Sequence, residues 1–303
     1  MLKGSPYLRG VTPLRWKVNI ERERKNVMLL EFLNRIASPK VKGAIVDVNY
    51  LDQESIVTMH ELMMESYSDI DIEKFKADLM GKNHVILIIE KSSDKIVGFS
   101  TLCTLKVNTG GEEAVGVFSG DTIVTRKYWG QIALQYTFLY YLCSVKLKNP
   151  GKKLYWFLIS KGYKTFLLMA NNFTNYYPSE KEATPTAIKD MMDQVYHSMY
   201  PERWVPEKGL IMNKSGDYAL KYGIAAPDET LAAENPKVKL FLDLNPDWEQ
   251  GVELACVAQM DYSIMTNYLK KKLTRMVPKH IQQRFSPLLG SPTVVEKAQA
   301  KGS

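Results

Sequence analysis

The chain has 303 residues, of which 45% are apolar and 24% are charged, a balance typical of globular proteins. Its most apolar run, residues 132–145, is shorter than the roughly 20 residues that a membrane-spanning helix needs, so we expect no membrane span. The length suits one large domain or two small ones around a sizeable core.

Basic residues outnumber acidic ones and give the chain a formal net charge of +7. Much of the excess lies at residues 22–25 and 270–279. A solvated basic face accounts for these residues, and the alternative is that they attract an acidic partner. The sequence has no basic motif interleaved with aromatic residues, so we expect no nucleic acid partner.

The cysteines and histidines are spaced too widely for a disulfide framework or a metal centre. The cysteines are Cys103, Cys143 and Cys256, and the histidines are His60, His84, His197 and His280. We interpret the cysteines as buried thiols of a cytoplasmic protein, because the N-terminal residues lack the apolar core of a secretion signal. We predict that no metal is bound.

In the first half of the chain, residues 1–43 are predicted to form an N-terminal extension with one amphipathic helix over residues 27–33. Apolar runs and turn residues then predict a strand, two helices and three antiparallel strands. These elements are expected at residues 44–48, 52–66, 71–80, 84–90, 96–102 and 114–118.

Residues 119–134 form the most informative segment of the chain. A strand leads into a tight turn at Gly130, and a strongly apolar helix is expected over residues 131–148. A strand-turn-helix of this kind places backbone N–H groups and a positive helix end beside the edge of a sheet. A phosphate can be held there.

In the second half of the chain, we predict a short helix over residues 154–160 and a buried strand over residues 165–170. This strand should run parallel to the strand before Gly130, because a helical crossover joins the two. The remaining expected elements are a polar aromatic loop (171–178), an insertion (179–236) with a helix (186–199), a closing hairpin (strands 237–244 and 252–258), a helix (261–276) and a disordered tail (286–303).

This order of elements resembles the GNAT superfamily of N-acetyltransferases over residues 44–175 and 237–260. The resemblance implies an α/β fold with a mixed, splayed central β-sheet flanked by helices, an N-terminal extension and a helical insertion. It places an acyltransferase-like core at residues 44–178, which residues 237–285 complete.

In that family, two parallel strands part and expose backbone groups that pair with the amides of pantetheine. The resemblance implies that the strands ending at Thr125 and Ala170 part in this way. The exposed backbone groups would then belong to Ile123, Val124 and Thr125.

The pyrophosphate loop of the family has the form Arg/Gln-x-x-Gly-x-Gly/Ala, and this chain departs from it. Trp129 stands at the Arg/Gln position, and Ile132 and Leu134 replace the two small residues. Glycine lets the backbone close on a phosphate, so the grip here should be looser or absent, with charge supplied by Arg126 and Lys127. The implied cofactor contacts beyond the strand are Arg126, Trp129, Gly130, Gln131, Ile132, Ala133 and Asn171.

Acyl transfer to an amine needs a base for the ammonium proton and an acid for the departing thiolate. Asp121 is our candidate base, because nearby apolar side chains would raise its pKa by desolvation, and the alternative is an Asp that caps a turn. Tyr176 and Tyr177 are candidate acids, with loop anchors as the alternative. Asn171 is a candidate contact for pantetheine or is simply a turn residue.

Two functions fit these features. The first is N-acyl transfer from acyl-CoA or from an acidic acyl carrier protein to an amine, by direct attack in a ternary complex. The second is a non-catalytic GNAT-like protein that keeps a pocket for a ligand or partner. An unrelated α/β fold is the third interpretation.

Overall fold

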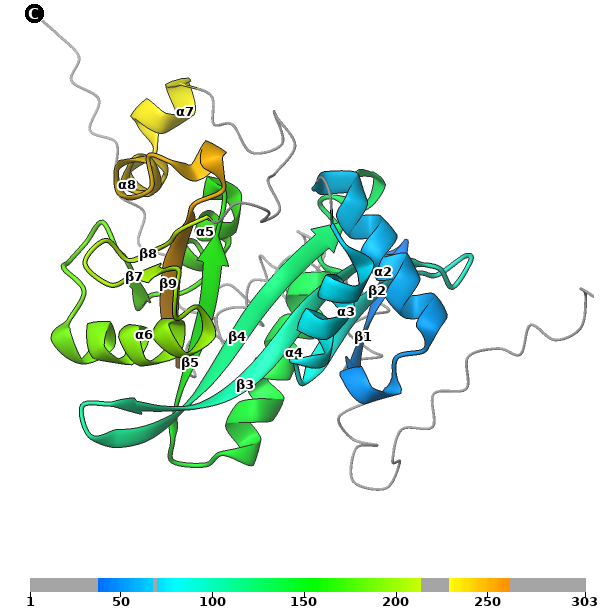
Figure 1. Cartoon of the computed structure of the whole chain (residues 1–303), viewed down its shortest axis with the longest axis horizontal. Helices are drawn as coiled ribbons and strands as arrows, with labels where there is room; N and C mark the ends of the chain where they lie inside the picture. Colours follow the sequence, from blue (N-terminus) through cyan, green and yellow to red (C-terminus); the bar gives the residue numbers. More distant parts are fainter. Residues whose placement is uncertain (1–37, 68–69, 214–228, 262–303) are drawn as a thin grey trace, which may run out of the picture. The chain divides into compact units, whose positions relative to one another are not determined.

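The structure, a computed structural model, describes residues 38–67, 70–213 and 229–261 (Figure 1). Its nine strands form one mixed sheet with the order β1-β2-β3-β4-β5-β9-β8-β7, and β6 pairs with β9 outside this path. The residue contacts divide the chain into two compact units. The long strands β3 (Ile96–Thr109) and β4 (Glu112–Val124) each contribute residues to both units.

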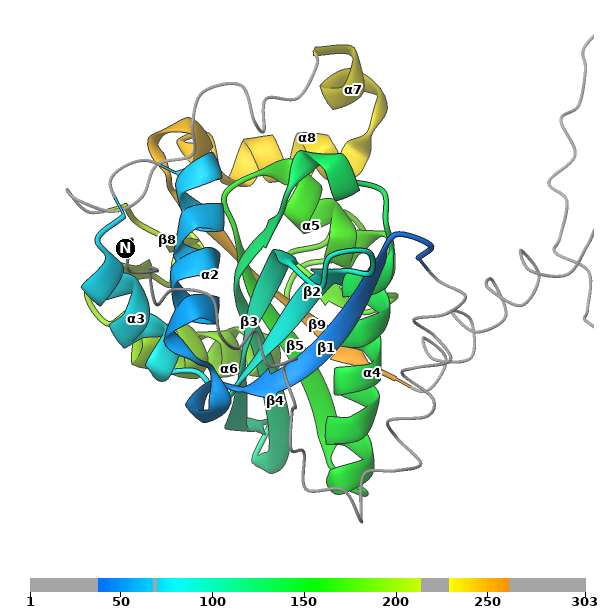
Figure 2. The ribbon, with the colours of Figure 1, turned by 90° about the vertical axis from the view of Figure 1, so that its right-hand side faces the viewer.

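The first unit takes in residues up to Glu65, Asp71–Thr101 and Asp121–Tyr141. Besides parts of β3 and β4, its elements are β1 (Val41–Asp47), η1 (Val48–Tyr50), α2 (Gln53–Ser66), α3 (Ile72–Met80), β2 (His84–Glu90), η2 (Arg126–Tyr128) and the first half of α4 (Ala133–Lys148). Within this unit, α2 and α3 lie on one face of the strands and α4 lies on the other, as both views show (Figures 1 and 2).

Close packing fixes both helical layers of the first unit. On one face, Phe75 of α3 meets Phe99 of β3 edge to face, with 6.1 Å between ring centroids. On the other face, Gly43 of β1 leaves room for α4, since a Cβ at this position would lie 1.9 Å from Thr137 Oγ1. The Asp71 carboxylate caps α3 by accepting a hydrogen bond from Lys74 N at 2.8 Å.

The second unit contains the remaining described residues. Its elements are β5 (Lys153–Ser160), α5 (Tyr163–Ala170), β6 (Tyr176–Tyr177), α6 (Thr186–Met199), β7 (Trp204–Val205), β8 (Leu210–Ile211), α7 (Glu229–Glu234), α8 (Pro236–Leu244), η3 (Trp248–Gln250) and β9 (Glu253–Met260). In this unit β4 pairs with β5 in parallel from Ala114–Lys153 to Ser119–Leu158, and β5 pairs with β9 antiparallel.

Helices cover the β5–β9 pair through buried aromatic side chains. Tyr196 of α6 is fully buried, and its hydroxyl lies 2.8 Å from the Leu158 carbonyl oxygen and 2.6 Å from that of Cys256. A single side chain therefore ties α6 to both strands. Elsewhere in this unit, Phe166 of α5 packs against Phe241 of α8 and Tyr176 of β6, at centroid distances of 6.0 and 6.2 Å.

Much of the predicted order of elements is confirmed. A strand, two helices, three antiparallel strands and an apolar helix follow one another as expected, although β1, β3 and β4 are longer than predicted. The helix over residues 186–199 and the strand at β9 are also present. The helices predicted over 27–33 and 261–276 and the tail predicted at 286–303 lie outside the described residues.

Three predicted elements are wrong. Residues 154–160 form strand β5, residues 165–170 lie in helix α5, and residues 237–244 lie in helix α8, so no closing hairpin forms. Short apolar runs have no period that separates a strand from a buried helix. The parallel neighbour of β4 is therefore β5, and the strand predicted to end at Ala170 does not exist.

A substitution at Gly98 tests how tightly β3 and the end of β4 approach each other. A Cβ on Gly98 would lie 2.7 Å from the Ile123 carbonyl oxygen and 3.0 Å from Val124 Cα, and neither atom can move without shifting the backbone. We expect Gly98→Ala to lower the free energy of unfolding by about 1–3 kcal/mol in urea denaturation.

Gly81→Ala is the matched control for this substitution. Gly81 has a right-handed helical backbone, and the nearest atom to an added Cβ is the Asp78 carbonyl oxygen at 3.2 Å. Its effect should stay below about 1 kcal/mol. Equal losses in the two variants would show that the β3–β4 approach is not tight.

Candidate functional site

The strand-turn-helix predicted from the sequence is present in the first unit. Strand β4 ends at Val124, η2 follows, and α4 begins at Ala133. Gly130 makes the turn with φ +82°, a left-handed conformation that favours glycine, and an added Cβ would meet no atom within 4 Å. Backbone conformation, and not lack of space, therefore explains the glycine at this position.

The start of α4 has the features of an anion-binding helix end. Its first backbone N–H groups have no acceptor within the helix, and the helix dipole gives this end a partial positive charge. Gln131 and Ile132 are half-buried and Ala133 is buried. Ile132 therefore stands at the helix start with a partly exposed side chain, where a glycine would have left the backbone open.

The Trp129 side chain forms a hydrogen bond with one of the backbone groups that were expected to meet pantetheine. Thr125 N–H donates to the Val97 carbonyl of β3 at 3.0 Å. Since strand residues alternate in direction, the N–H and C=O of Val124 point away from β3. The indole Nε1 of Trp129 donates to the Val124 carbonyl oxygen at 2.7 Å, and the Arg126 guanidinium lies 5.5 Å from the Trp129 ring centroid. A pantetheine amide that donates to this carbonyl would share it with the indole.

Glu90, at the end of β2, holds η2 in place and was missed by the sequence analysis. Its carboxylate accepts hydrogen bonds from Ser93 Oγ at 2.6 Å, from the Tyr128 hydroxyl, and from Lys127 Nζ at 3.2 Å. These partners, with Ser93 first, lower the pKa of Glu90 to about 2. Hydrogen bonds with Tyr128 and Glu90 in turn raise the pKa of Lys127.

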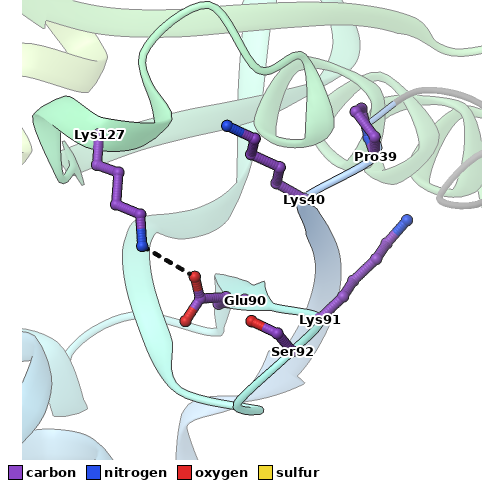
Figure 3. A pocket seen from close by; sticks show the side chains of 6 residues that line it. All are labelled: Pro39, Lys40, Glu90, Lys91, Ser92 and Lys127. Carbon is purple, nitrogen blue, oxygen red and sulfur yellow. Dashed lines mark hydrogen bonds and ion pairs between the residues drawn. The ribbon is translucent and has the colours of Figure 1, made fainter.

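A cavity of about 470 Å³ opens beside Glu90 (Figure 3). It is lined by Pro39, Lys40, Glu90, Lys91, Ser92 and Lys127. Lys127 was expected to supply charge at the turn, whereas Lys40 and Lys91 carry no sequence signal. The pairing of β1 with β2 places Lys40 near Lys91, and the ion pair with Glu90 places Lys127 beside the same cavity.

The candidate base Asp121 lies on β4 within the first unit and is half-buried. Its neighbour Ile123 is buried. On the same strand, the Thr122 hydroxyl shares a hydrogen bond of 2.7 Å with the Ser100 hydroxyl of β3. Asp121 thus belongs to a strand segment that is held firmly to β3. Its catalytic role stays a prediction.

The two candidate acids lie in the second unit and not at the end of a strand over residues 165–170. They form β6, where Tyr176 pairs with Ala258 of β9. Tyr176 is 1% exposed and donates to the Glu180 carboxylate, whereas the half-buried Tyr177 donates to Glu182 Oε1 at 2.8 Å. Burial first, then the hydrogen bond to the carboxylate, raises the pKa of each phenol.

Asn171 also lies elsewhere than expected. It is the C-terminal cap of α5, and its Oδ1 accepts a hydrogen bond from Lys237 Nζ of α8 at 3.0 Å. The same ammonium donates to the Ala170 carbonyl at 2.6 Å. In this arrangement Asn171 joins two helices of the second unit.

A buried carboxylate in the second unit was also missed. Glu253, at the start of β9, is 7% exposed and lies 3.9 Å from Lys161 Nζ and 3.6 Å from Arg203 Nη2. The Lys161 ammonium also lies over the Tyr67 ring. A buried charge needs partners of opposite sign, and these two cations supply them. The cluster lies where the end of β5 meets the start of β9.

The part of the chain that the structure describes has neither a metal-site cluster nor a membrane-spanning helix. In residues 38–67, 70–213 and 229–261, no three His, Cys, Asp or Glu side chains gather as a metal site would require. None of the helices that the structure describes combines the length and apolar character needed to cross a membrane.

No protein-family model matches the sequence, and no curated protein matches it either. A solved probable N-acyltransferase from Enterococcus faecalis V583 matches at 11% identity and TM-score 0.33, over 43% of this chain and 32% of that chain. A GNAT family N-acetyltransferase from Escherichia coli, in complex with CoA, matches at 15% identity and TM-score 0.32, over 45% and 69% of the two chains.

Glucosamine-6-phosphate N-acetyltransferase from Arabidopsis thaliana matches at 13% identity and TM-score 0.33, over 48% of this chain and 99% of that chain.

The depressed pKa of Glu90 predicts a pH-dependent contribution to stability. The ionised carboxylate is stabilised in the folded chain, so its contribution is complete above the ordinary pKa of 4.5 and is lost as the pH falls toward about 2. We expect Glu90→Gln to be less stable than the wild type at pH 7, and the difference should shrink below pH 4.5 in urea titrations.

Glu61→Gln, at an exposed position on α2, is the control for this titration. We expect this variant to differ from the wild type by less than about 0.5 kcal/mol at pH 7. A Glu90→Gln difference that stays constant down to pH 2 would contradict the assigned network.

Proposed function

We propose that the chain is a GNAT-like N-acyltransferase that transfers an acyl group from acyl-CoA or an acyl carrier protein to an amine. The observation that carries the proposal is the turn from β4 through η2 and Gly130 into α4. It follows a strand that pairs in parallel with β5, as the resemblance requires of the donor-binding strand. The unpaired N–H groups at the start of α4 suit the phosphates of the donor.

The proposed reaction is direct attack of the amine on the thioester carbonyl carbon. A base removes the ammonium proton, the tetrahedral intermediate collapses, and the carbon–sulfur bond breaks as the thiolate leaves with a proton from an acid. We assign the base to Asp121. We assign no acid, because Tyr176 and Tyr177 belong to the second unit whereas Asp121 belongs to the first.

A second candidate function is binding of a ligand or partner without catalysis. The hydrogen bond from Trp129 Nε1 to the Val124 carbonyl favours it, because the indole takes the place of a donor amide. Ile132 and Leu134 in place of small residues point the same way. The two functions differ in turnover and not in the presence of a pocket.

Thiol release separates the two functions. The assay uses acetyl-CoA and a long-chain acyl-CoA with a panel of amines, and a thermal shift with CoA runs in parallel. Amine-dependent release supports acyl transfer. A thermal shift without release supports the binding function, and neither signal with any donor would contradict both uses of CoA.

Asp121→Asn tests the assigned base, because the amide cannot accept the ammonium proton. We expect kcat for thiol release to fall about 100-fold or more, with the thermal shift by CoA unchanged. Asp190→Asn, at an exposed position on α6, is the control and should retain the wild-type kcat. Full activity of Asp121→Asn would remove Asp121 from the mechanism.

A further inference from the structure

A buried hydroxyl without a hydrogen-bond partner lies on β3 of the first unit. Thr101 is 1% exposed, and its Oγ1 is buried and accepts or donates no hydrogen bond to any group that the structure describes. Buried polar groups in proteins are nearly always paired, because leaving one unpaired costs the free energy of its lost hydration. The Thr101 hydroxyl therefore needs an explanation.

The pairing of β3 with β4 places Thr101 opposite Asp121, the assigned base. The two strands are antiparallel neighbours in the sheet, and the Ser100 and Thr122 hydroxyls share a hydrogen bond of 2.7 Å across them. The backbone hydrogen bond from Thr125 to β3 follows the same register. One step forward on β3 and one step back on β4 lead from the Ser100–Thr122 pair to Thr101 and Asp121.

The side chains of both residues belong to the face that carries α2 and α3. Side chains alternate along a strand, so Thr101 and Asp121 lie on the face opposite to the neighbouring hydroxyl pair. Phe99, two residues before Thr101, meets Phe75 of α3 on this face. Opposite residues on one face have Cβ atoms about 4.5–5.5 Å apart, so two short polar side chains there can bond directly or through one water.

Asp121 is the polar group that strand pairing brings to this hydroxyl. The next residues on the same face, Phe99 of β3 and Ile123 of β4, are buried and apolar. Asp121 itself is half-buried, so a ligand can reach it where it cannot reach Thr101. A carboxylate offers about four acceptor sites, so Asp121 can accept from Thr101 and keep its other partners.

We infer that Thr101 is a positioning residue for Asp121 in acyl transfer, an inference that rests on the proposed function. When the acceptor amine is bound, the Thr101 hydroxyl donates to one Asp121 oxygen, directly or through one water, and the other oxygen faces the ammonium group. An N–H bond of the ammonium breaks, its proton passes to that second oxygen, and the electron pair stays on nitrogen for attack on the thioester. Thr101 keeps its own proton and directs the base without touching the substrate.

Thr101→Val tests the inference on the full chain, because valine keeps the shape of the side chain and removes the hydroxyl. We expect kcat for thiol release to fall about tenfold or more, with KM for the acyl-CoA within about twofold of the wild type, and Thr101→Ser should restore kcat to within about threefold. Since the hydroxyl has no partner in the free chain, Thr101→Val should not lower the midpoint of urea unfolding. Thr104→Val, at an exposed position on β3, is the matched control and should keep the wild-type kcat.

Combining the substitution with Asp121→Asn shows whether Thr101 acts through the base. In that background Thr101→Val should change the residual kcat by less than about twofold, because the base that it positions is gone. A tenfold loss that persists there, a Thr101→Val kcat equal to the wild type, or a lowered urea midpoint would each overturn the inference and leave acyl transfer in place. No thiol release by the wild type with any donor would contradict the proposed function, and the role of Thr101 with it.

Discussion

The hydrogen bonds of the Glu90 carboxylate fix the turn on which the candidate donor site depends. One short segment, Lys127 and Tyr128, is attached by them to the end of β2. Just before η2, Thr125 N–H donates to the Val97 carbonyl of β3. The same carboxylate forms an ion pair with Lys127, which lines the cavity beside Glu90. A single acid thus positions both the start of α4 and one wall of the cavity.

Two different constraints act on the turn after β4. Gly130 is required by its positive φ, since a side chain there would meet no steric obstacle but would strain the backbone. Trp129 is fixed by a hydrogen bond to the Val124 carbonyl and remains 53% exposed. The first constraint sets the shape of the turn before α4. The second places a large aromatic ring where the resemblance implies a ligand amide.

The elements that could be predicted from the sequence are those with a distinctive hydrophobic period or distinctive helix-capping residues. Helix α6 has buried side chains at Met191, Met192, Val195 and Tyr196, a spacing that only a helix explains. Residues 154–160 and 165–170 are apolar except for Ser160 and Thr165, so their composition fits both a strand and a buried helix, and each was assigned to the wrong one. For α8 a signal was present: Asn235 caps the helix by accepting from Lys237 N at 3.0 Å, and Pro236 opens it.

The polar sites were less predictable than the fold, for a physical reason. The hydrogen bonds of Glu90 and the cavity beside it involve residues that lie far apart in the sequence. The fold of the sheet brings these residues together. Glu253 is similar, since its partners Lys161 and Arg203 come from separate elements. The strand-turn-helix was predictable because all of its parts are contiguous. A local sequence pattern is therefore enough to predict a turn. Predicting which charged residues pair across a sheet also requires the register of its strands.

The bulky residues of the turn limit how closely its backbone can approach a ligand. A glycine-rich loop binds phosphate through backbone N–H groups and requires the backbone to approach closely, which Ile132 and Leu134 hinder. Gly130 keeps its positive φ, so the reversal of the chain before α4 does not depend on small residues at positions 132 and 134. The shape of the turn and the access of a ligand to its backbone are therefore set by different residues.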